Sequence, residues 1–79
     1  MRGTWKGKII DFVPGRLMVG IKSTVNRELA MEKIEEFGCK VDYISKESID
    51  IIVDPQDTLN VASALEVTGN FRFVTPEVI

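Results

Sequence analysis

The hydrophobic and polar positions of this chain follow two different periods. Residues 16–22, 41–46, 49–53 and 71–74 alternate with a period of two, as half-buried strands do. Residues 26–37 and 57–67 instead carry apolar side chains at helical spacing. The pattern therefore predicts the order strand, helix, two strands, helix, strand.

Local signals at the ends of these segments agree with the periods. Asn26 is a suitable N-cap for the first helix and Gly38 is placed to end it. Asp57 or Thr58 can cap the second helix. Pro14-Gly15 is expected to bend an extended segment at 8–13 into the strand at 16–22. The remaining breaks are Asp54-Pro55, Gly69-Asn70 and Thr75-Pro76.

This order of elements predicts an α+β fold of the ferredoxin-like βαββαβ type. It has a four-stranded antiparallel sheet with two helices on one face. Right-handed crossovers place the closing strand beside the first, the first beside the third, and the third beside the second, so that the order across the sheet is 71–74, 16–22, 49–53, 41–46. We expect residues 1–79 to form one domain, because the chain is too short for two cores. Residues 1–12 are then an extra N-terminal strand or arm.

The alternation also divides the sheet residues between two faces. The residues expected to face the helices are Leu17, Val19, Ile21, Ile49, Ile51, Val53, Phe71 and Phe73. The apolar residues expected to point away are Met18, Ile44, Ile52 and Val74. An uncovered apolar surface of this kind is typical of a contact site. Alternatively, Trp5, Ile10 and Phe12 fold back over it, or two copies of the chain pair through it as a homodimer.

Charge and composition narrow the classes of partner. The net charge is −2, which gives no general attraction to nucleic acid. Arg2, Lys6 and Lys8 cluster beside Trp5, where we favour a solvated tail over a nucleic-acid contact. No apolar run is long enough to span a membrane. We expect a cytoplasmic protein if the chain is full-length as given; excision from a secreted precursor stays open.

Residues that carry chemistry are few. The chain has no histidine and one cysteine, so it offers no metal-ligand set, catalytic triad or internal disulfide. We expect no catalytic residue, no metal and no cofactor, and therefore no enzyme. Cys39 is interpreted as a small buried residue rather than a reactive thiol. Tyr43, Phe71 and Phe73 could stack on bases, but core packing is the stronger interpretation.

Residues 13–22, 28–41 and 65–77 resemble parts of the propeptides of subtilisin-type proteases, a family that includes small free-standing inhibitors. Residues 13–22 are similar to the family's first strand, and residues 28–41 to its first helix and the turn that follows. Residues 65–77 resemble its closing helix, turn and strand. The resemblance implies a ferredoxin-like fold whose sheet face docks on a subtilisin-like protease and whose C-terminal tail occupies the substrate cleft. It implies inhibition and assisted folding of that protease, and no cofactor.

The resemblance also assigns residues to those two contacts. The protease-contact sheet face would be Met18, Ile44, Ile52 and Val74, and the inhibitory tail would be Thr75, Pro76, Glu77, Val78 and Ile79. Thr75 stands where the family commonly has an acidic residue, and Ile79 is β-branched at the position that would enter a specificity pocket. The alternative is a stand-alone ferredoxin-like interaction module that self-associates through its sheet face and inhibits nothing.

Overall fold

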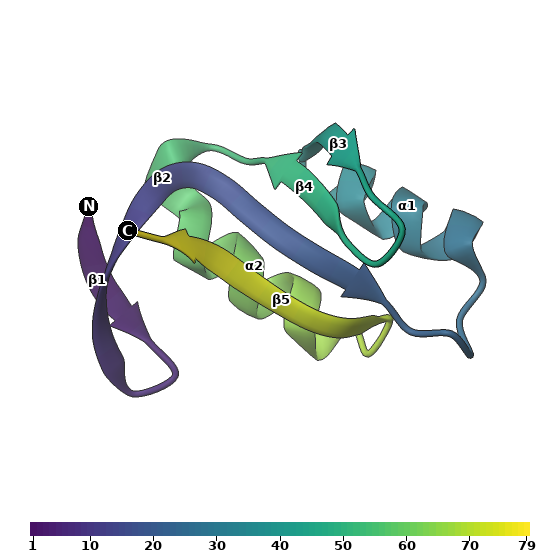
Figure 1. Ribbon diagram of the computed structural model, residues 1–79, viewed down its shortest axis with the longest axis horizontal. Coiled ribbons are helices and arrows are strands. Elements are labelled where there is room, and N and C mark those ends of the chain that lie inside the picture. The colour runs from purple at the N-terminus through teal and green to yellow at the C-terminus, as the bar shows by residue number, and fades with distance from the viewer.

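The computed structural model describes all residues 1–79 and contains five strands and two α-helices (Figure 1). A 3₁₀ turn at Pro55–Asp57 leads into the second helix. The elements in chain order are β1 (Arg2–Trp5), β2 (Lys8–Ile21), α1 (Arg27–Glu36), β3 (Lys40–Ile44), β4 (Ile49–Ile52), α2 (Thr58–Val67) and β5 (Phe71–Val78). The two periods in the sequence therefore correspond to the observed strands and helices.

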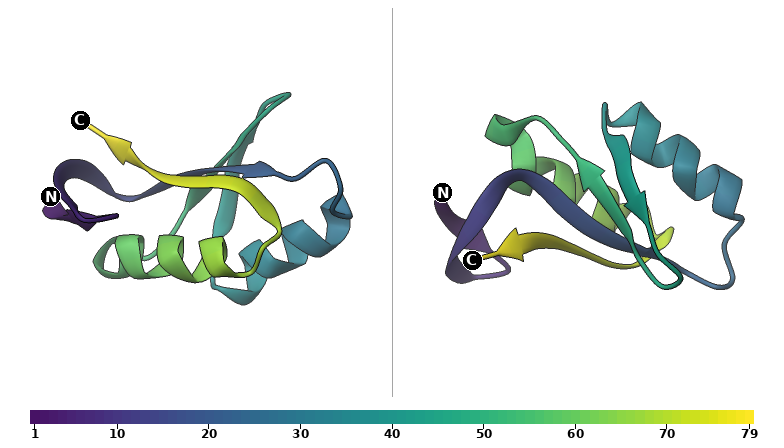
Figure 2. Two further views of the ribbon diagram at one scale, coloured as in Figure 1. Left: turned by 90° about the horizontal axis from the view of Figure 1, so that it is seen from below. Right: turned by 45° about the horizontal axis from the view of Figure 1, so that its top comes forward.

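All strand pairs in the sheet are antiparallel. β2 lies between β4 and β5, and β3 pairs with β4, which gives the order β5-β2-β4-β3. This confirms the predicted order. Both helices lie on one side of the sheet, as the left view of Figure 2 shows. The strand count is five rather than four, because β1 pairs with the first part of the long strand β2.

The core fills the space between the sheet and the helices. Its helical members are Ala30 and Ile34 of α1 and Ala62 and Leu65 of α2, each fully buried. The sheet contributes Leu17, Val19, Ile49, Ile51, Phe71 and Val74, and Cys39 and Val53 complete the cluster. Phe37 continues the helical spacing of Ala30 and Ile34 but is 38% exposed, because it lies at the C-cap where the chain leaves the helix.

The helix ends show which capping predictions are correct. Asn26 caps α1 by accepting a hydrogen bond from the Glu28 N–H, and Gly38 ends it at a φ of 76°. The N-cap of α2 is Asp57, but its side chain makes no capping bond. Asp54 instead caps the preceding 3₁₀ turn by accepting from the Gln56 N–H. That turn displaces the side-chain cap by three residues.

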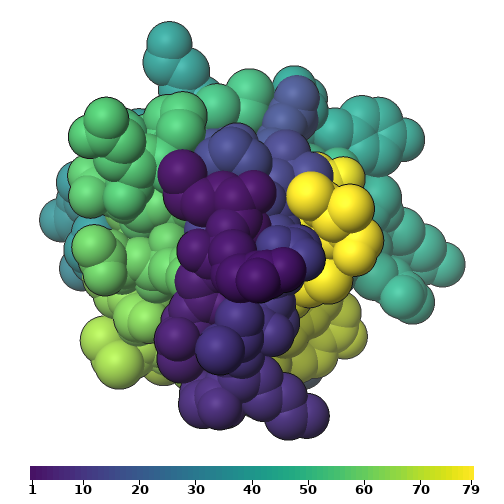
Figure 3. All heavy atoms as spheres, turned by 90° about the vertical axis from the view of Figure 1, so that its left-hand side faces the viewer, coloured from purple at the N-terminus to yellow at the C-terminus, as the bar shows by residue number.

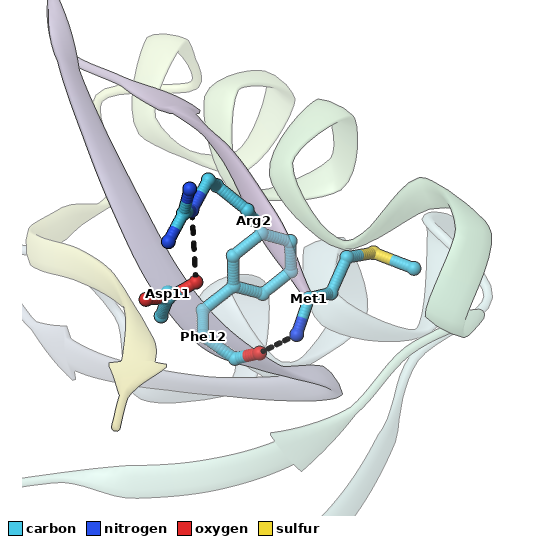
Figure 4. Close-up of polar contacts among 4 residues, drawn as sticks. All are labelled: Met1, Arg2, Asp11 and Phe12. Carbon is cyan, nitrogen blue, oxygen red and sulfur yellow. Dashed lines mark hydrogen bonds and ion pairs between the residues drawn. The ribbon is translucent and has the colours of Figure 1, made fainter.

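The N-terminal hairpin is held at one end of the molecule. The Met1 amino group donates to the Phe12 carbonyl at 3.0 Å, and Arg2 pairs with Asp11 at 3.3 Å (Figure 4). The Ile79 N–H donates to the Asp11 carbonyl at 3.0 Å, so the last residues lie beside this hairpin (Figure 3). Trp5 packs against the core cluster and Phe12 is buried. The N-terminal segment therefore does not cover the other face of the sheet.

Two β-bulges overturn part of the predicted division between faces. A register shift between Val41 and Tyr43 pairs Ile44 with the buried Ile49, so Ile44 lies on the helix side. A second shift between Gly20 and Ile21 pairs Gly20 with Phe73. Phe73 was expected to face the helices but lies on the opposite face, where its ring covers Gly20.

Val74 and the tail also differ from the prediction. Val74 pairs with the buried Val19 and is itself only 3% exposed, so it belongs to the core and not to an outer patch. Thr75, Pro76, Glu77 and Val78 continue β5 alongside β2, and Pro76 is buried. These residues form a strand of the sheet, not a free tail; Ile79 follows directly after that strand.

Neither helix is long and apolar enough to cross a membrane.

Candidate functional site

The sheet face that points away from the helices, called the open face below, has no protein covering. Register places Met18 opposite Asp50 and Arg16 opposite Ile52 on this face. Met18 and Ile52 are 38% and 39% exposed. These two of the four predicted patch residues therefore lie together on the open face, whereas Ile44 and Val74 do not. Tyr43, which is opposite Asp50 and 63% exposed, joins them.

A hollow of about 430 Å³ opens on this face and is called the sheet hollow here. It is lined by Arg16, Leu17, Met18, Asp50 and Glu77. Glu77 was predicted only as part of a tail, and its position in β5 brings it to this hollow. The site thus combines the Met18 side chain from the centre of the sheet with carboxylates from both neighbouring strands, while Leu17 keeps its side chain in the core.

Negative charge exceeds positive charge around the sheet hollow. The Arg16 guanidinium donates to the Asp42 carboxylate, and this hydrogen bond and charge raise the pKa of Arg16 above its ordinary value, with smaller contributions from Glu77 and Asp50. Asp50 and Glu77 take part in no ion pair, since the four pairs in the structure involve other carboxylates. The hollow therefore carries two carboxylates whose charge is not matched by a neighbour in contact.

A second, polar hollow of about 120 Å³ lies at the end of the sheet where the β3–β4 turn meets α1 and β5. It is called the cationic hollow here. Three cationic side chains border it, together with two hydroxyls and one carboxylate. Its lining is Ile21, Arg27, Ser45, Lys46, Glu47, Ser48, Ile49 and Arg72.

Hydrogen bonds fix the two serines and Arg72 of the cationic hollow. The Ser45 hydroxyl contacts the Ser48 hydroxyl at 2.9 Å and accepts from the Ser48 N–H at 3.2 Å, which fixes the turn. The Arg72 guanidinium donates to the Glu47 carbonyl at 3.0 Å and stands 5.4 Å from the centre of the Phe73 ring. Arg27, Lys46 and Arg72 take part in no ion pair.

The two hollows are close neighbours along the sheet. Asp50 of the sheet hollow is two residues from Ser48 of the cationic hollow, about 7 Å of extended chain. On the opposite side, Glu77 is five residues from Arg72, about 17 Å. One extended segment of a few residues could contact both hollows.

Sequence reasoning did not find the cationic hollow. In the sequence, Lys46, Glu47 and Ser48 are only the polar residues that separate two strands. Arg27 and Arg72 join them only through the tertiary fold, since they lie in other elements. The one available signal was the pair of hydroxyls flanking a lysine in a hairpin turn.

The remaining candidate residues do not form a site. Burial raises the pKa of the Cys39 thiol, so this side chain is protonated at neutral pH and is a poor nucleophile. Among the basic residues of the N-terminus, Arg2 pairs with Asp11 and Lys6 pairs with Glu66. No group of three or more His, Cys, Asp or Glu side chains is arranged to hold a metal ion.

Comparison with known proteins gives one match. The family model described as "BRCA1 C Terminus (BRCT) domain" matches residues 12–79. No curated protein and no solved structure matches the chain. The match leaves β1 and the first residues of β2 outside the matched region.

This match corrects the family assigned from the sequence. The resemblance to subtilisin-type propeptides is wrong, and with it the expectation of a protease inhibitor that binds and helps to fold a subtilisin-like protease. The quoted segments are short, and their element order is one that the ferredoxin-like arrangement itself imposes. Their similarity therefore reflects a shared order of strands and helices and not membership of the same family.

Proposed function

Because the chain belongs to the BRCA1 C Terminus (BRCT) domain family, we propose that it is a protein-interaction module that binds a phosphorylated segment of its partner. BRCT domains are generally non-enzymatic and bind phosphoproteins or DNA-repair partners. They usually work in DNA repair or cell-cycle signalling, and are usually intracellular. We extend the binding of a phosphoprotein, and a location in the cytoplasm or nucleus, to this chain.

The observation that supports this proposal is the cationic hollow. Arg27, Lys46 and Arg72 supply three positive charges without a paired carboxylate, and Glu47 supplies one negative charge. A phosphoserine carries a charge of about −1.5 to −2 at neutral pH and has three strong acceptor oxygens. The net charge around the hollow is thus opposite in sign to the ligand, although the whole chain is acidic.

The donor geometry supports the same ligand. A guanidinium presents a planar fork of N–H donors that fits two phosphate oxygens, whereas an ammonium acts as a point charge. Arg27 and Arg72 supply two such forks, and the Ser48 hydroxyl can donate to a third oxygen, while the Ser45 hydroxyl donates to the Ser48 carbonyl at 3.0 Å. The volume of about 120 Å³ equals roughly four waters of liquid volume, which is space for a small anionic group.

An NMR titration tests the proposal directly. The ¹⁵N-labelled chain is titrated with a capped Gly-phosphoserine-Gly peptide and separately with its unphosphorylated form. We expect the amide signals of Arg27, Ser45, Ser48 and Arg72 to shift with the phosphorylated peptide alone. A dissociation constant of about 1 mM, or about −4 kcal/mol, is realistic for so short a ligand.

Matched substitutions identify the side chains responsible. Arg72→Gln should weaken phosphopeptide binding at least fivefold. Arg2→Gln, which removes an exposed arginine at the other end of the molecule, should leave it unchanged. Equal shifts with the two peptides, or shifts confined to other residues, would contradict phosphate recognition at this hollow.

A further inference from the structure

The sheet hollow plays no part in holding the phosphate, and its chemistry is different. We propose that it receives the side chain of a lysine or arginine from the same partner segment, three to five residues from the phosphorylated position. The placement rests on the proposed function, because the cationic hollow fixes where the segment begins. The partner recognised by this face is therefore a segment that is both phosphorylated and basic.

The charge of the sheet hollow determines the kind of side chain it accepts. Arg16 is occupied by Asp42, so these two charges cancel locally. Asp50 and Glu77 line the hollow from the two strands on either side of β2 and have no cation in contact. Lys40, the other cation that register places on the open face, lies opposite Ile52 on the edge strand β3. A cationic group bound between Asp50 and Glu77 would supply the missing charge.

The apolar lining selects a long cationic side chain. Met18 lines the hollow from β2, between the strands that carry Asp50 and Glu77, and Ile52 is beside Arg16 on the same face. Lysine and arginine bury their methylene chains against apolar surface while the charged end stays near water or a carboxylate. Methionine adapts its shape to such a chain. A small free cation would leave Met18 exposed.

The spacing follows from strand geometry. A segment running beside β5 from Arg72 toward Glu77 covers about 3.3 Å per residue. Thr75, which lies opposite Met18, is three residues from Arg72, and Glu77 is five residues away. The cationic residue of the partner should therefore be three to five positions from the phosphoserine.

A second copy of this chain fits the open face less well than such a segment. Two open faces packed together would bring Asp50 and Glu77 of both copies into one interface, where like charges oppose association. The exposed apolar side chains at the hollow are few, and Met18 and Ile52 are each more than half buried already. A standard interface needs about 800 Å² from each partner.

Selection from oriented peptide libraries tests the inference. One library has a fixed central phosphoserine and the other a fixed serine, with degenerate positions on both sides. We expect lysine and arginine to be enriched three to five positions from the phosphoserine. The doubly substituted chain Asp50→Asn/Glu77→Gln should lose this enrichment and bind a selected peptide about fivefold more weakly.

A matched control removes the same charge elsewhere. Glu32→Gln/Glu35→Gln changes two exposed carboxylates of α1 and should keep the enrichment. Thermal melting of both double variants checks that the fold is intact. Phosphate-dependent selection with no preference for lysine or arginine would overturn this inference but not phosphate recognition. A preference that Asp50→Asn/Glu77→Gln does not change would do the same. Equal recovery from the two libraries would overturn phosphate recognition instead.

The other occupant to test for is a second copy of the chain, which sedimentation detects. Sedimentation of the chain as a dimer that Ile52→Asp dissociates would show that a second copy covers the open face, and would overturn the inference. A monomer at the concentration used for selection supports a free face.

Discussion

The buried hydroxyl of Thr58 is the most informative single group to remove. The Thr58 side chain is 1% exposed and lies between two backbone segments. Its Oγ1 accepts from the Gly15 N–H at 2.7 Å and donates to the Pro55 carbonyl at 2.9 Å. Thr58 therefore joins β2 at Gly15 to the 3₁₀ turn that precedes α2.

Replacing this hydroxyl by a methyl group should destabilise the fold. In Thr58→Val the shape of the side chain is kept, but the buried Gly15 N–H loses its acceptor. Leaving a buried donor unsatisfied costs about 1–3 kcal/mol. In a domain of this size, 1 kcal/mol shifts the melting temperature by about 4–8 °C. We expect a loss of about 2 kcal/mol and a fall in the melting temperature of about 8–16 °C.

Thr58→Ser supplies the control. It keeps the hydroxyl and removes one methyl group, which costs about 1 kcal/mol. Urea denaturation measures the free energy of unfolding of the three chains, and amide hydrogen exchange reports on Gly15 itself. The Gly15 amide should stay protected in Thr58→Ser and exchange faster in Thr58→Val. A Thr58→Val chain within 0.5 kcal/mol of the original, with unchanged exchange at Gly15, would refute the reasoning.

Two further predictions concern the sheet faces and the cysteine. Ile52→Asp, on the open face, should stay folded by circular dichroism, with a melting temperature within a few degrees of that of the original chain. Val74→Asp should unfold the domain because it buries an unpaired charge. Similar melting of the two variants would show that the faces are assigned wrongly. The raised pKa of the Cys39 thiol means that the folded chain keeps this proton at a pH where the unfolded chain, with a thiol pKa of about 8.5, has lost it. Stability should thus fall as the pH rises above that value, and Cys39→Ala should reduce this fall, as denaturation at pH 7.5 and 9.5 would measure; an identical decrease in both chains would contradict it.

The two periods in the sequence were enough to predict the order of elements and the sheet order, because period and crossover hand leave few alternatives. The prediction of faces was wrong where a strand departs from strict alternation. One unpaired residue near Asp42 turns Ile44 to the helix side, and one at Arg72 exchanges the positions of Phe73 and Val74. Nothing in the local pattern distinguishes such a bulge from regular strand.

The candidate site was harder to predict, since its residues come from separate elements. Met18 and Ile52 were found because alternation alone exposes them. Arg27 and Arg72 are far apart in the sequence and meet only when α1 and β5 approach the β3–β4 turn. The propeptide resemblance was misleading for a related reason, since it matched an order of elements and included only two residues of the cationic hollow, Ile21 and Arg72.

The bulge in β3 has a consequence for how this chain behaves at high concentration. All five residues of β3 are exposed, and the strand forms one edge of the sheet. A flat edge offers unpaired N–H and C=O groups to any extended chain, which is a common route to aggregation. The bulge interrupts that row near Asp42, and Pro76 in the opposite edge strand β5 has no N–H to offer. Straightening β3 by deleting Asp42 should therefore release the edge to recruit further strands and drive the protein toward fibrils.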